Sequence, residues 1–584
     1  MENEKAKGGG MEKLAAFIVD KRNLFFLLYI FALIFSVIAS GWVKVEDDIT
    51  TYLPDTTETR QGLTVMNDNF VTYGTANVMV SNITYDTALD LQAQIEDIEG
   101  VSTVEFDDTK DHYKDASALF SVSFDAEVGD ERAENALQQI RDKLEGSYDT
   151  SIYSEVGYDS SADLQSEMLV IVIIAAVIIV VVLTLTSRSY AEVPVLIMTF
   201  GAAALLNMGT NFLCGTISFI SNSVTVILQL ALAIDYAIIL CHRFSDEHET
   251  LPTREACIAA LSKAIPEISS SSLTTISGLA ALAFMHFGIG RDLATVLIKA
   301  ILFSMLCVFT LMPGLLVLFS KLIDKTRHKN LIPKITAVGK FDIKTRFVIP
   351  PIFGVVIIAA AVFANLCPYC YTFTDLVTAK QNERQIAYQK IKNEFGSSNM
   401  VAVIVPAGNY EAEGAILDEL DSCAEVKSTM GLANIEAMDG YVLTDALTPR
   451  QLAELADLDY EVTKALYGAY AVDHDEYGEI INGLDDYRVP LYDMFRFLEQ
   501  EMHDGNITLS GDVQDTLDDL FDQLDEAQKQ LQSDSYSRMV VYLNLPEETD
   551  ETFAFVNRMH DIIGKYYDKD SFYVVGNTTS AMDL

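Results

Sequence analysis

Basic residues are scarce in this chain of 584 residues. Lys and Arg number 40, against 84 Asp and Glu, which leaves a formal net charge of −44. Proteins that bind nucleic acid gather Lys and Arg to meet the phosphates. The charge balance therefore argues against nucleic acid as a partner.

The motifs of several enzyme classes are missing as well. We find no P-loop and no nucleophile elbow, and no cysteines at zinc-ligand spacing. Cys367 and Cys370 form a CPYC tetrapeptide of glutaredoxin type, but it follows an apolar run instead of joining a strand to a helix. We interpret it as a local disulfide or two free thiols. We expect no enzyme, no cofactor and no bound metal, and any transport should use an energy source other than ATP.

Long apolar runs, in contrast, are plentiful, and 50% of the residues are hydrophobic. A bilayer-spanning helix needs about 20 apolar residues. Seven runs reach that length: Leu24–Val43, Met168–Leu185, Pro194–Cys214, Ile217–Cys241, Ile268–Phe287, Leu293–Phe319 and Phe347–Leu366. The first is too long for a typical signal peptide and lacks a small-residue cleavage site, so we expect a retained helix.

The positions of Lys and Arg predict the orientation of these spans. Basic residues precede the first run and gather again between the sixth and seventh, which places the N-terminus in the cytoplasm. The expected segments are a cytoplasmic N-terminus (1–23), a first span (24–43), an extracytoplasmic domain (44–167), a bundle of five spans (168–319), a basic cytoplasmic linker (320–346), a seventh span (347–366) and a second extracytoplasmic domain (367–584). The expected location is the plasma membrane, which is the cytoplasmic membrane of a bacterium.

Both extracytoplasmic segments alternate short β-rich runs with amphipathic helices. The first predicts strands at 76–81, 101–106, 116–124 and 151–156 and helices at 87–98 and 131–144. The second predicts helices at 383–395, 412–422 and 551–566 and strands at 400–405 and 539–543. The order strand, helix, strand, strand, helix, strand is typical of a ferredoxin-like fold. We therefore predict a multi-pass α-helical membrane protein with two α/β, ferredoxin-like, porter-type extracytoplasmic domains.

The two segments also end alike. VGYDSSADL ends at Leu164 and VGNTTSAMDL ends at Leu584, which indicates an internal duplication of one span with its domain. Five further spans follow the first copy, so we expect a second set of five after Leu584; a natural half-length product is the alternative. The second copy carries an insert, roughly Thr448–Asp534, whose acidic helices are expected to expose a solvated face.

Asp235 is the residue that most strongly suggests a function. It interrupts a run that is otherwise uncharged from Pro194 to Cys241, and it lies eight residues before Arg243, about 12 Å from the cytoplasmic boundary. A carboxylate at such a depth costs on the order of 3 kcal/mol and indicates a role such as proton relay. The alternative is a neutral Asp that hydrogen-bonds between helices.

Other polar residues lie at a similar depth in the neighbouring runs. Thr274, Thr275 and Ser277 belong to a hydroxyl-rich stretch of the fifth run, nearly level with Asp235; they could serve the relay or let helices pack closely. Lys299 lies about 9 Å inside the sixth run. It could extend its amine outward to the membrane surface or reach toward Asp235.

The stretch LAIDYAIILCHRFSDEH around Asp235 resembles the fourth-span signature of the MMPL group of the RND (resistance–nodulation–division) transporter superfamily. The resemblance extends to TTISGLAAL, FGIGRDLATVLIKAILFSML, LMPGLL and YLPDTTETRQG. It covers the chain as one and a half of the two six-helix repeats of that family, so the chain looks truncated before the second set of transmembrane helices.

This resemblance implies proton-driven export of lipids, lipid-linked molecules or drugs. Asp235 and Tyr236 would take part in proton transfer, and the ectodomains would form the substrate passage. The implied partners are the lipid bilayer, a hydrophobic or lipid substrate, and either the missing C-terminal half or an oligomer. Two other interpretations stay open: a protein-export accessory of the SecDF type, and a sterol-sensing-like receptor, which would not need a titrating Asp235.

Overall fold

The computed structural model describes residues 9–46, 48–158, 160–328, 336–366, 381–396, 399–438, 440–456, 458–480, 483–503 and 528–584, together with 505, 521 and 524. The chain divides into two compact units. One comprises Met1–Pro54 and Asp159–Pro368, and the other comprises Asp55–Tyr158 and Tyr369–Leu584. The CPYC tetrapeptide lies outside the described residues.

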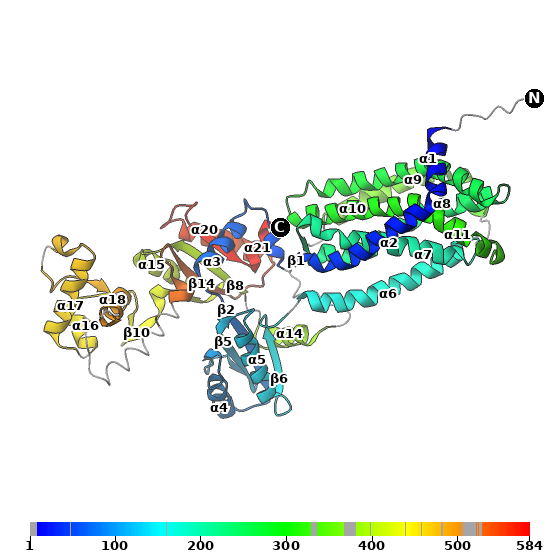
Figure 1. The fold of residues 1–584 in the computed structure, drawn as a ribbon. Helices are drawn as coiled ribbons and strands as arrows, with labels where there is room; N and C mark the ends of the chain where they lie inside the picture. Colours follow the sequence, from blue (N-terminus) through cyan, green and yellow to red (C-terminus); the bar gives the residue numbers. More distant parts are fainter. Residues whose placement is uncertain are drawn as a thin grey trace, which may run out of the picture. The chain divides into compact units, whose positions relative to one another are not determined.

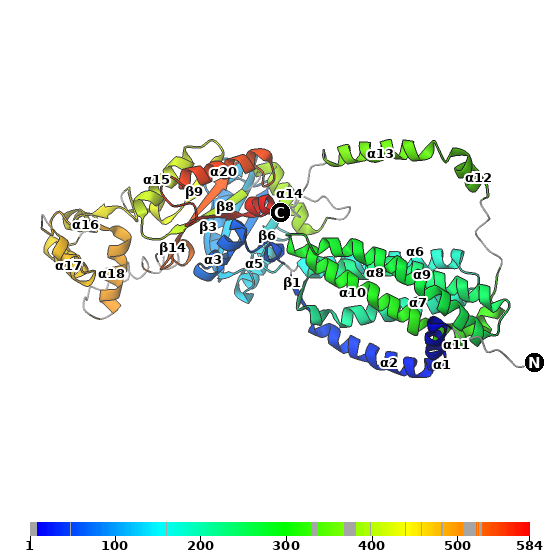
Figure 2. The same ribbon diagram turned by 90° about the horizontal axis from the view of Figure 1, so that it is seen from above.

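The first unit is helical. Its helices are α1 (Gly10–Asp20), α2 (Arg22–Ala39), α6 (Ser160–Thr186), α7 (Glu192–Gly209), α8 (Phe219–His248), α9 (Thr253–Leu282), α10 (Gly288–Thr310), α11 (Met312–Lys325), α12 (Thr336–Thr345) and α13 (Ile349–Ala364). Helices α7 to α10 run side by side (Figures 1 and 2), and α2 packs on α7. Their facing sides bury one continuous apolar core.

Four of these described helices are long and apolar enough to cross a membrane: α2 with the turn after it, α7, α8 and α10. The α12–α13 pair, bent by 85°, would make a fifth if it is one span. The apolar part of α6, Val170–Thr186, is shorter. The helices therefore fit a membrane protein, and the division into seven spans stays a prediction.

The sequence pattern suggested that the sixth apolar run is one helix, but the structure divides it into two. Helix α10 ends at Thr310 and α11 begins at Met312, with Pro313 in its first turn. Proline has no backbone N–H, and the first turn of a helix needs none, so a new helix starts there readily. A second unpredicted feature is a parallel pair of short strands, β1 (Lys44–Glu46) and β7 (Thr216–Ser218).

The second unit contains two antiparallel sheets with the same strand order. We call the first sheet, with helices α4 (Tyr85–Glu96) and α5 (Glu131–Leu144), the first lobe; its strands run β3-β5-β2-β6, with the short β4 (Tyr113–Lys114) beside β5. The bounds are β2 (Tyr73–Ser81), β3 (Val101–Glu105), β5 (Ser117–Glu127) and β6 (Asp149–Ser154). Apolar side chains of α4 and α5 form the core with one face of this sheet.

The second lobe repeats this plan with the order β15-β8-β14-β9. Its elements are β8 (Asn399–Pro406), α15 (Tyr410–Asp421), β9 (Val426–Met430), β14 (Tyr536–Leu543), α20 (Asp550–Ile563) and β15 (Tyr573–Gly576). Counted along each copy, both sheets place the strands in the order fourth, first, third, second. Helices α15 and α20 supply the core on one face.

Each copy sends one helix to the other copy's sheet. Helix α3 (Glu58–Asn69), which precedes the first lobe, packs on β15 of the second; helix α14 (Glu383–Phe395), which precedes the second lobe, packs on β6 of the first. The α3 contact is close, since a Cβ added to Gly62 would lie 2.7 Å from Tyr573 Cβ. The two lobes are thereby joined by an exchange of helices.

The insert of the second copy has a core of its own. Its described helices are α16 (Pro449–Leu455), α17 (Tyr460–Asp473) and α18 (Leu491–His503). Between them Tyr467 is fully buried, and Tyr492, Phe495 and Phe497 are nearly so. The acidic stretch 512–531 lies largely outside the described residues. The aromatic core was not predicted from the sequence.

Candidate functional site

Helix α8 carries the predicted site, and its start is fixed by hydrogen bonds. The Ser218 hydroxyl accepts from Ser221 N and so caps the helix. Asp292 of α10 in turn accepts from Ser218 N and from Ser218 Oγ, both at 2.9 Å. This arrangement ties the first turns of α8 and α10 together and fixes which face of α8 meets α10.

A stripe of buried polar residues follows along that face. Ser221, Thr225 and Gln229 recur at every fourth position and are all at most 2% exposed. Gln229 Nε2 donates to Ala300 O at 3.2 Å and to Ser304 Oγ at 3.3 Å, both on α10. The sequence analysis missed Gln229, although the four-residue spacing of polar side chains in an apolar helix was a visible signal.

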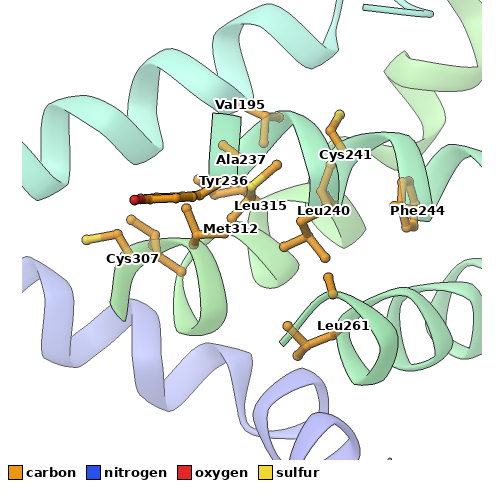
Figure 3. Close-up of a cluster of buried hydrophobic side chains, with 14 of the residues drawn as sticks. Val195, Tyr236, Ala237, Leu240, Cys241, Phe244, Leu261, Cys307, Met312 and Leu315 are labelled. Carbon is orange, nitrogen blue, oxygen red and sulfur yellow. The ribbon is translucent and has the colours of Figure 1, made fainter. Parts of the chain in front are cut away.

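Tyr236 lies on the same buried side of α8, closer to the end of the helix that is predicted to face the cytoplasm. It is 3% exposed and belongs to the apolar core. Figure 3 shows its ring beside Cys307 and Met312, with Ala237 and Leu240 next along the helix. Tyr236 thus anchors α8 in the bundle.

Asp235 points elsewhere. Successive residues of an α-helix are about 100° apart, so the carboxylate leaves the packed side on which Tyr236 lies. Asp235 is exposed in this chain, and within the described residues it has neither a hydrogen-bond partner nor an ion pair. The predicted pair is therefore split between two surroundings, one buried and one open.

The hydroxyls predicted beside Asp235 bond within their own helix. On α9, Thr274 Oγ1 donates to Ser270 O at 3.2 Å, Thr275 Oγ1 to Ser271 O at 3.3 Å, and Ser277 Oγ to Leu273 O at 2.8 Å. Thr274 and Ser277 are exposed and Thr275 is half-buried. No hydrogen bond joins these hydroxyls to Asp235, although α8 and α9 are neighbours in the bundle.

Lys299 neither extends its amine to the membrane surface nor reaches toward Asp235. Its Nζ donates to Asn207 O at 3.1 Å and to Asn211 Oδ1 at 2.5 Å. Asn207 O lies at the C-terminal end of α7, where backbone carbonyls lack helical partners and attract a cation. Asn211 lies in the turn just beyond that end. Lys299 therefore closes the end of α7 against α10, and the structure does not bring it to Asp235.

A further carboxylate, Glu192 at the start of α7, was also missed from the sequence. It is fully buried. It accepts from Arg188 N at 2.8 Å and from Ser245 Oγ of α8 at 2.7 Å. These hydrogen bonds engage both carboxylate oxygens of Glu192 and reach from α7 to α8, so Glu192 positions α8 against α7.

Taken together, these contacts leave Asp235 as the acid of α8 that is placed inside an apolar stretch and bound to nothing within the described residues. Across the described parts of the chain, no group of three or more His, Cys, Asp or Glu side chains could hold a metal ion.

Comparison with known proteins bears on the family resemblance. Residues 88–338 match the model of the MMPL family, a segment that includes α8, α9 and α10. The resemblance deduced from the motifs is thus confirmed over that segment. No curated protein sequence matches the chain.

Among solved structures, the chain is similar to two of SecDF. One is a super-membrane-facing form, at 16% identity and a TM-score of 0.31. The other is described as a translocon-associated membrane protein from Thermus thermophilus, at 15% identity and a TM-score of 0.31. Each match covers 55% of this chain and 40% of the SecDF chain. The apolar helices and the MMPL match point to a membrane protein.

Proposed function

We propose that this chain belongs to a proton-motive-force-driven transporter of the RND/MMPL type that exports lipids, lipid-linked molecules or other hydrophobic molecules, drugs included. The carrying observation is Asp235: a carboxylate on a helix long enough to cross a membrane, within the MMPL-matched segment, with no partner among the described residues. An ionisable group so placed is suited to bind a proton on one side and release it on the other.

In this proposal Asp235 carries the proton and Tyr236 is its neighbour in the relay. Because the Tyr236 ring is held in the core, it gives α8 a fixed side from which Asp235 projects. A change of charge at Asp235 alters how its face of α8 packs, and α8 transmits this to α10, to which it is bonded at Asp292 and Ser304.

The face with Asp235, Thr274 and Ser277 is proposed to meet further helices. A carboxylate and several hydroxyls turned toward lipid are unfavourable. The transmembrane helices of a second copy of the chain would cover this face and supply groups for proton exchange. Thr275, half-buried at the same level, would lie at the edge of that contact.

The proposal keeps the predicted topology. The N-terminus lies in the cytoplasm, the protein in the plasma membrane, and the two lobes outside as ferredoxin-like porter domains that form the passage for the substrate. The same strand order in both sheets and the exchange of α3 and α14 support the assignment of the two lobes as a pair of ferredoxin-like domains.

The test is Asp235→Asn in the full-length protein, with substrate efflux measured under an imposed pH gradient. Asn is nearly isosteric and still forms hydrogen bonds, but it cannot titrate near neutral pH. We expect efflux to fall to the background of membranes without the protein, with normal expression and insertion. Asp342→Asn, which removes an exposed carboxylate from α12, should leave efflux unchanged. Efflux at the normal rate in Asp235→Asn would refute the relay, whereas absence of proton-driven efflux in wild type would favour a receptor.

A further inference from the structure

Two arginines lie where one copy meets the other in the second unit, and they differ in how well they are paired. Arg384 of α14 is fully engaged with the first lobe. It forms an ion pair with Glu155, donates from Nε to Ser154 O at 3.1 Å, and stacks over the Tyr158 ring at 4.0 Å. This side chain shows what a satisfied guanidinium at this contact looks like.

Arg538 of β14 is the contrasting case. Its strand neighbours Met539 and Val541 face the core under α15 and α20. Since strand side chains alternate, Arg538 points from the opposite face of the sheet. There it meets Phe70 and Thr72, which follow α3 in the chain; its Nη1 donates to Thr72 Oγ1 at 3.4 Å and its guanidinium lies 5.3 Å from the Phe70 ring centre.

The charge of Arg538 is buried without a counter-ion. The side chain is 8% exposed, its Nε has no hydrogen-bond partner, and no carboxylate of the described residues pairs with it. Burial lowers the pKa of the guanidinium to about 10, so it is still a cation at neutral pH. A buried cation without an anion is costly, and a planar fork of five N–H donors is largely unused here.

The surroundings of Arg538 are apolar. Phe70, Ile404 and Val575 form a small buried cluster on this face of the sheet, with Met66, Tyr536 and Tyr573 packed against it. A cationic fork that adjoins an apolar surface matches a molecule with an anionic head and an apolar chain. The Thr72 hydrogen bond is long, so a better acceptor could replace it.

We propose that Arg538 is the head-binding residue of a subsite for an anionic amphiphile, in which a phosphate or carboxylate group pairs with the guanidinium and the chain lies along the Phe70 cluster. This inference rests on the proposed function and narrows its substrate class from hydrophobic molecules in general to those that carry an anionic group.

Binding to the purified full-length protein in a neutral maltoside detergent tests the subsite without transport. The probes are dihexanoyl phosphatidic acid, the uncharged dihexanoylglycerol and inorganic phosphate, titrated by calorimetry. We expect phosphatidic acid to bind at least about tenfold more tightly than either of the others. Arg538→Gln should remove that preference, whereas Arg558→Gln, an exposed arginine of the same lobe paired with Glu425, should keep it.

A role in packing alone predicts a different result. If Arg538 only fills space against Phe70 and Thr72, Arg538→Met lowers the melting temperature of the ligand-free protein. If the charge awaits a ligand, Arg538→Met melts at the same or a higher temperature, and phosphatidic acid raises the melting temperature of wild type only. Phosphate that binds as tightly as phosphatidic acid, or a preference that survives Arg538→Gln, would overturn the subsite.

The same titration with Asp235→Asn separates this inference from the proposed function. Binding there should equal that of wild type, because no proton gradient is involved. Loss of coupling in Asp235→Asn with intact phosphatidic acid binding supports both conclusions. Normal efflux in Asp235→Asn would refute the proton relay alone, and absent binding in wild type would refute the subsite alone.

Discussion

Glu413 is a carboxyl group enclosed in the core of the second lobe. It projects from α15 and is 1% exposed, whereas Glu411, two residues earlier on the same helix, is exposed. Burial raises the pKa of Glu413 to about 7, and the neighbouring Ser537 hydroxyl offsets part of this effect. A proton on Glu413 therefore stabilises the folded second lobe.

The stability of the second lobe should consequently fall as the pH rises. Because the folded pKa of about 7 exceeds the ordinary value of 4.5, the stabilisation is complete below pH 4.5 and is lost as the pH passes 7. The difference amounts to about 3 kcal/mol. Hydrogen exchange of β14 in the full-length protein, corrected for the intrinsic pH dependence, should show faster opening at pH 8 than at pH 5.

Glu413→Gln should remove this pH dependence and slow the exchange of β14 at pH 8, because Gln stays neutral. Glu411→Gln should behave as wild type. Equal pH dependence in wild type and Glu413→Gln would mean that Glu413 is not the group that titrates.

Among the elements, α2 and α7 cross at a point that only glycine permits. A Cβ added to Gly209 would lie 2.3 Å from Ser36 Cα and 2.4 Å from Ser36 O, which are backbone atoms and cannot rotate away. Gly201 of the same helix has no heavy atom within 4 Å of such a Cβ. Two glycines of one helix thus offer a matched comparison.

Gly209→Ala should push α2 from α7 and lower stability by about 1–3 kcal/mol, whereas Gly201→Ala should be neutral or stabilise by up to about 1 kcal/mol. The single tryptophan reports on this crossing, since Trp42 lies 5.9 Å from Phe35 of α2 and 5.5 Å from Phe212 beyond α7, between ring centres. Its fluorescence, followed on heating in detergent, gives both melting temperatures. Equal melting temperatures in the two variants would contradict the close crossing.

The ends of some elements were predictable because side chains mark them. Helix α5 begins after Asp130, whose side chain accepts from Arg132 N, and α14 begins after Asn382, which forms a capping box with Gln385. Both helices have the bounds expected from the sequence. The strands β9 and β15 were missed because five and four residues carry too little pattern, and their pairing depends on β14 and β8, which are distant in sequence.

For the whole molecule, the topology itself can be measured. Cysteines placed at Asp108 in the first lobe and at Glu255 near the start of α9 are both at exposed positions. In intact cells, a membrane-impermeant maleimide should label Asp108→Cys above the level of the parent protein and should reach Glu255→Cys only after permeabilisation. Labelling of Glu255→Cys in intact cells would contradict the predicted orientation.

For the whole molecule, the sequence predicted which segments are helices or strands better than it predicted the contacts between them. Apolar length located most helices of the first unit, though not α1 or α12, and alternation located most strands of the two lobes. The sequence could not reveal that Lys299 binds the end of α7. Nor could it reveal that Arg538 has no counter-ion among the described residues, since both facts depend on residues tens or hundreds of positions away. Nor could it show that Asp235 and Tyr236 face different surroundings, because that depends on which side of α8 the bundle covers.

The exchange of α3 and α14 also has a consequence for the ancestry of the fold. In each copy the helix that follows the first apolar span lies on the fourth strand of the other copy. An ancestor with a single copy would have had no such strand to receive its helix except that of a second molecule. Such molecules would have met as a symmetric pair, each lending a helix to the other. Fusion of the two genes would then have converted this contact between two molecules into a contact within a single chain.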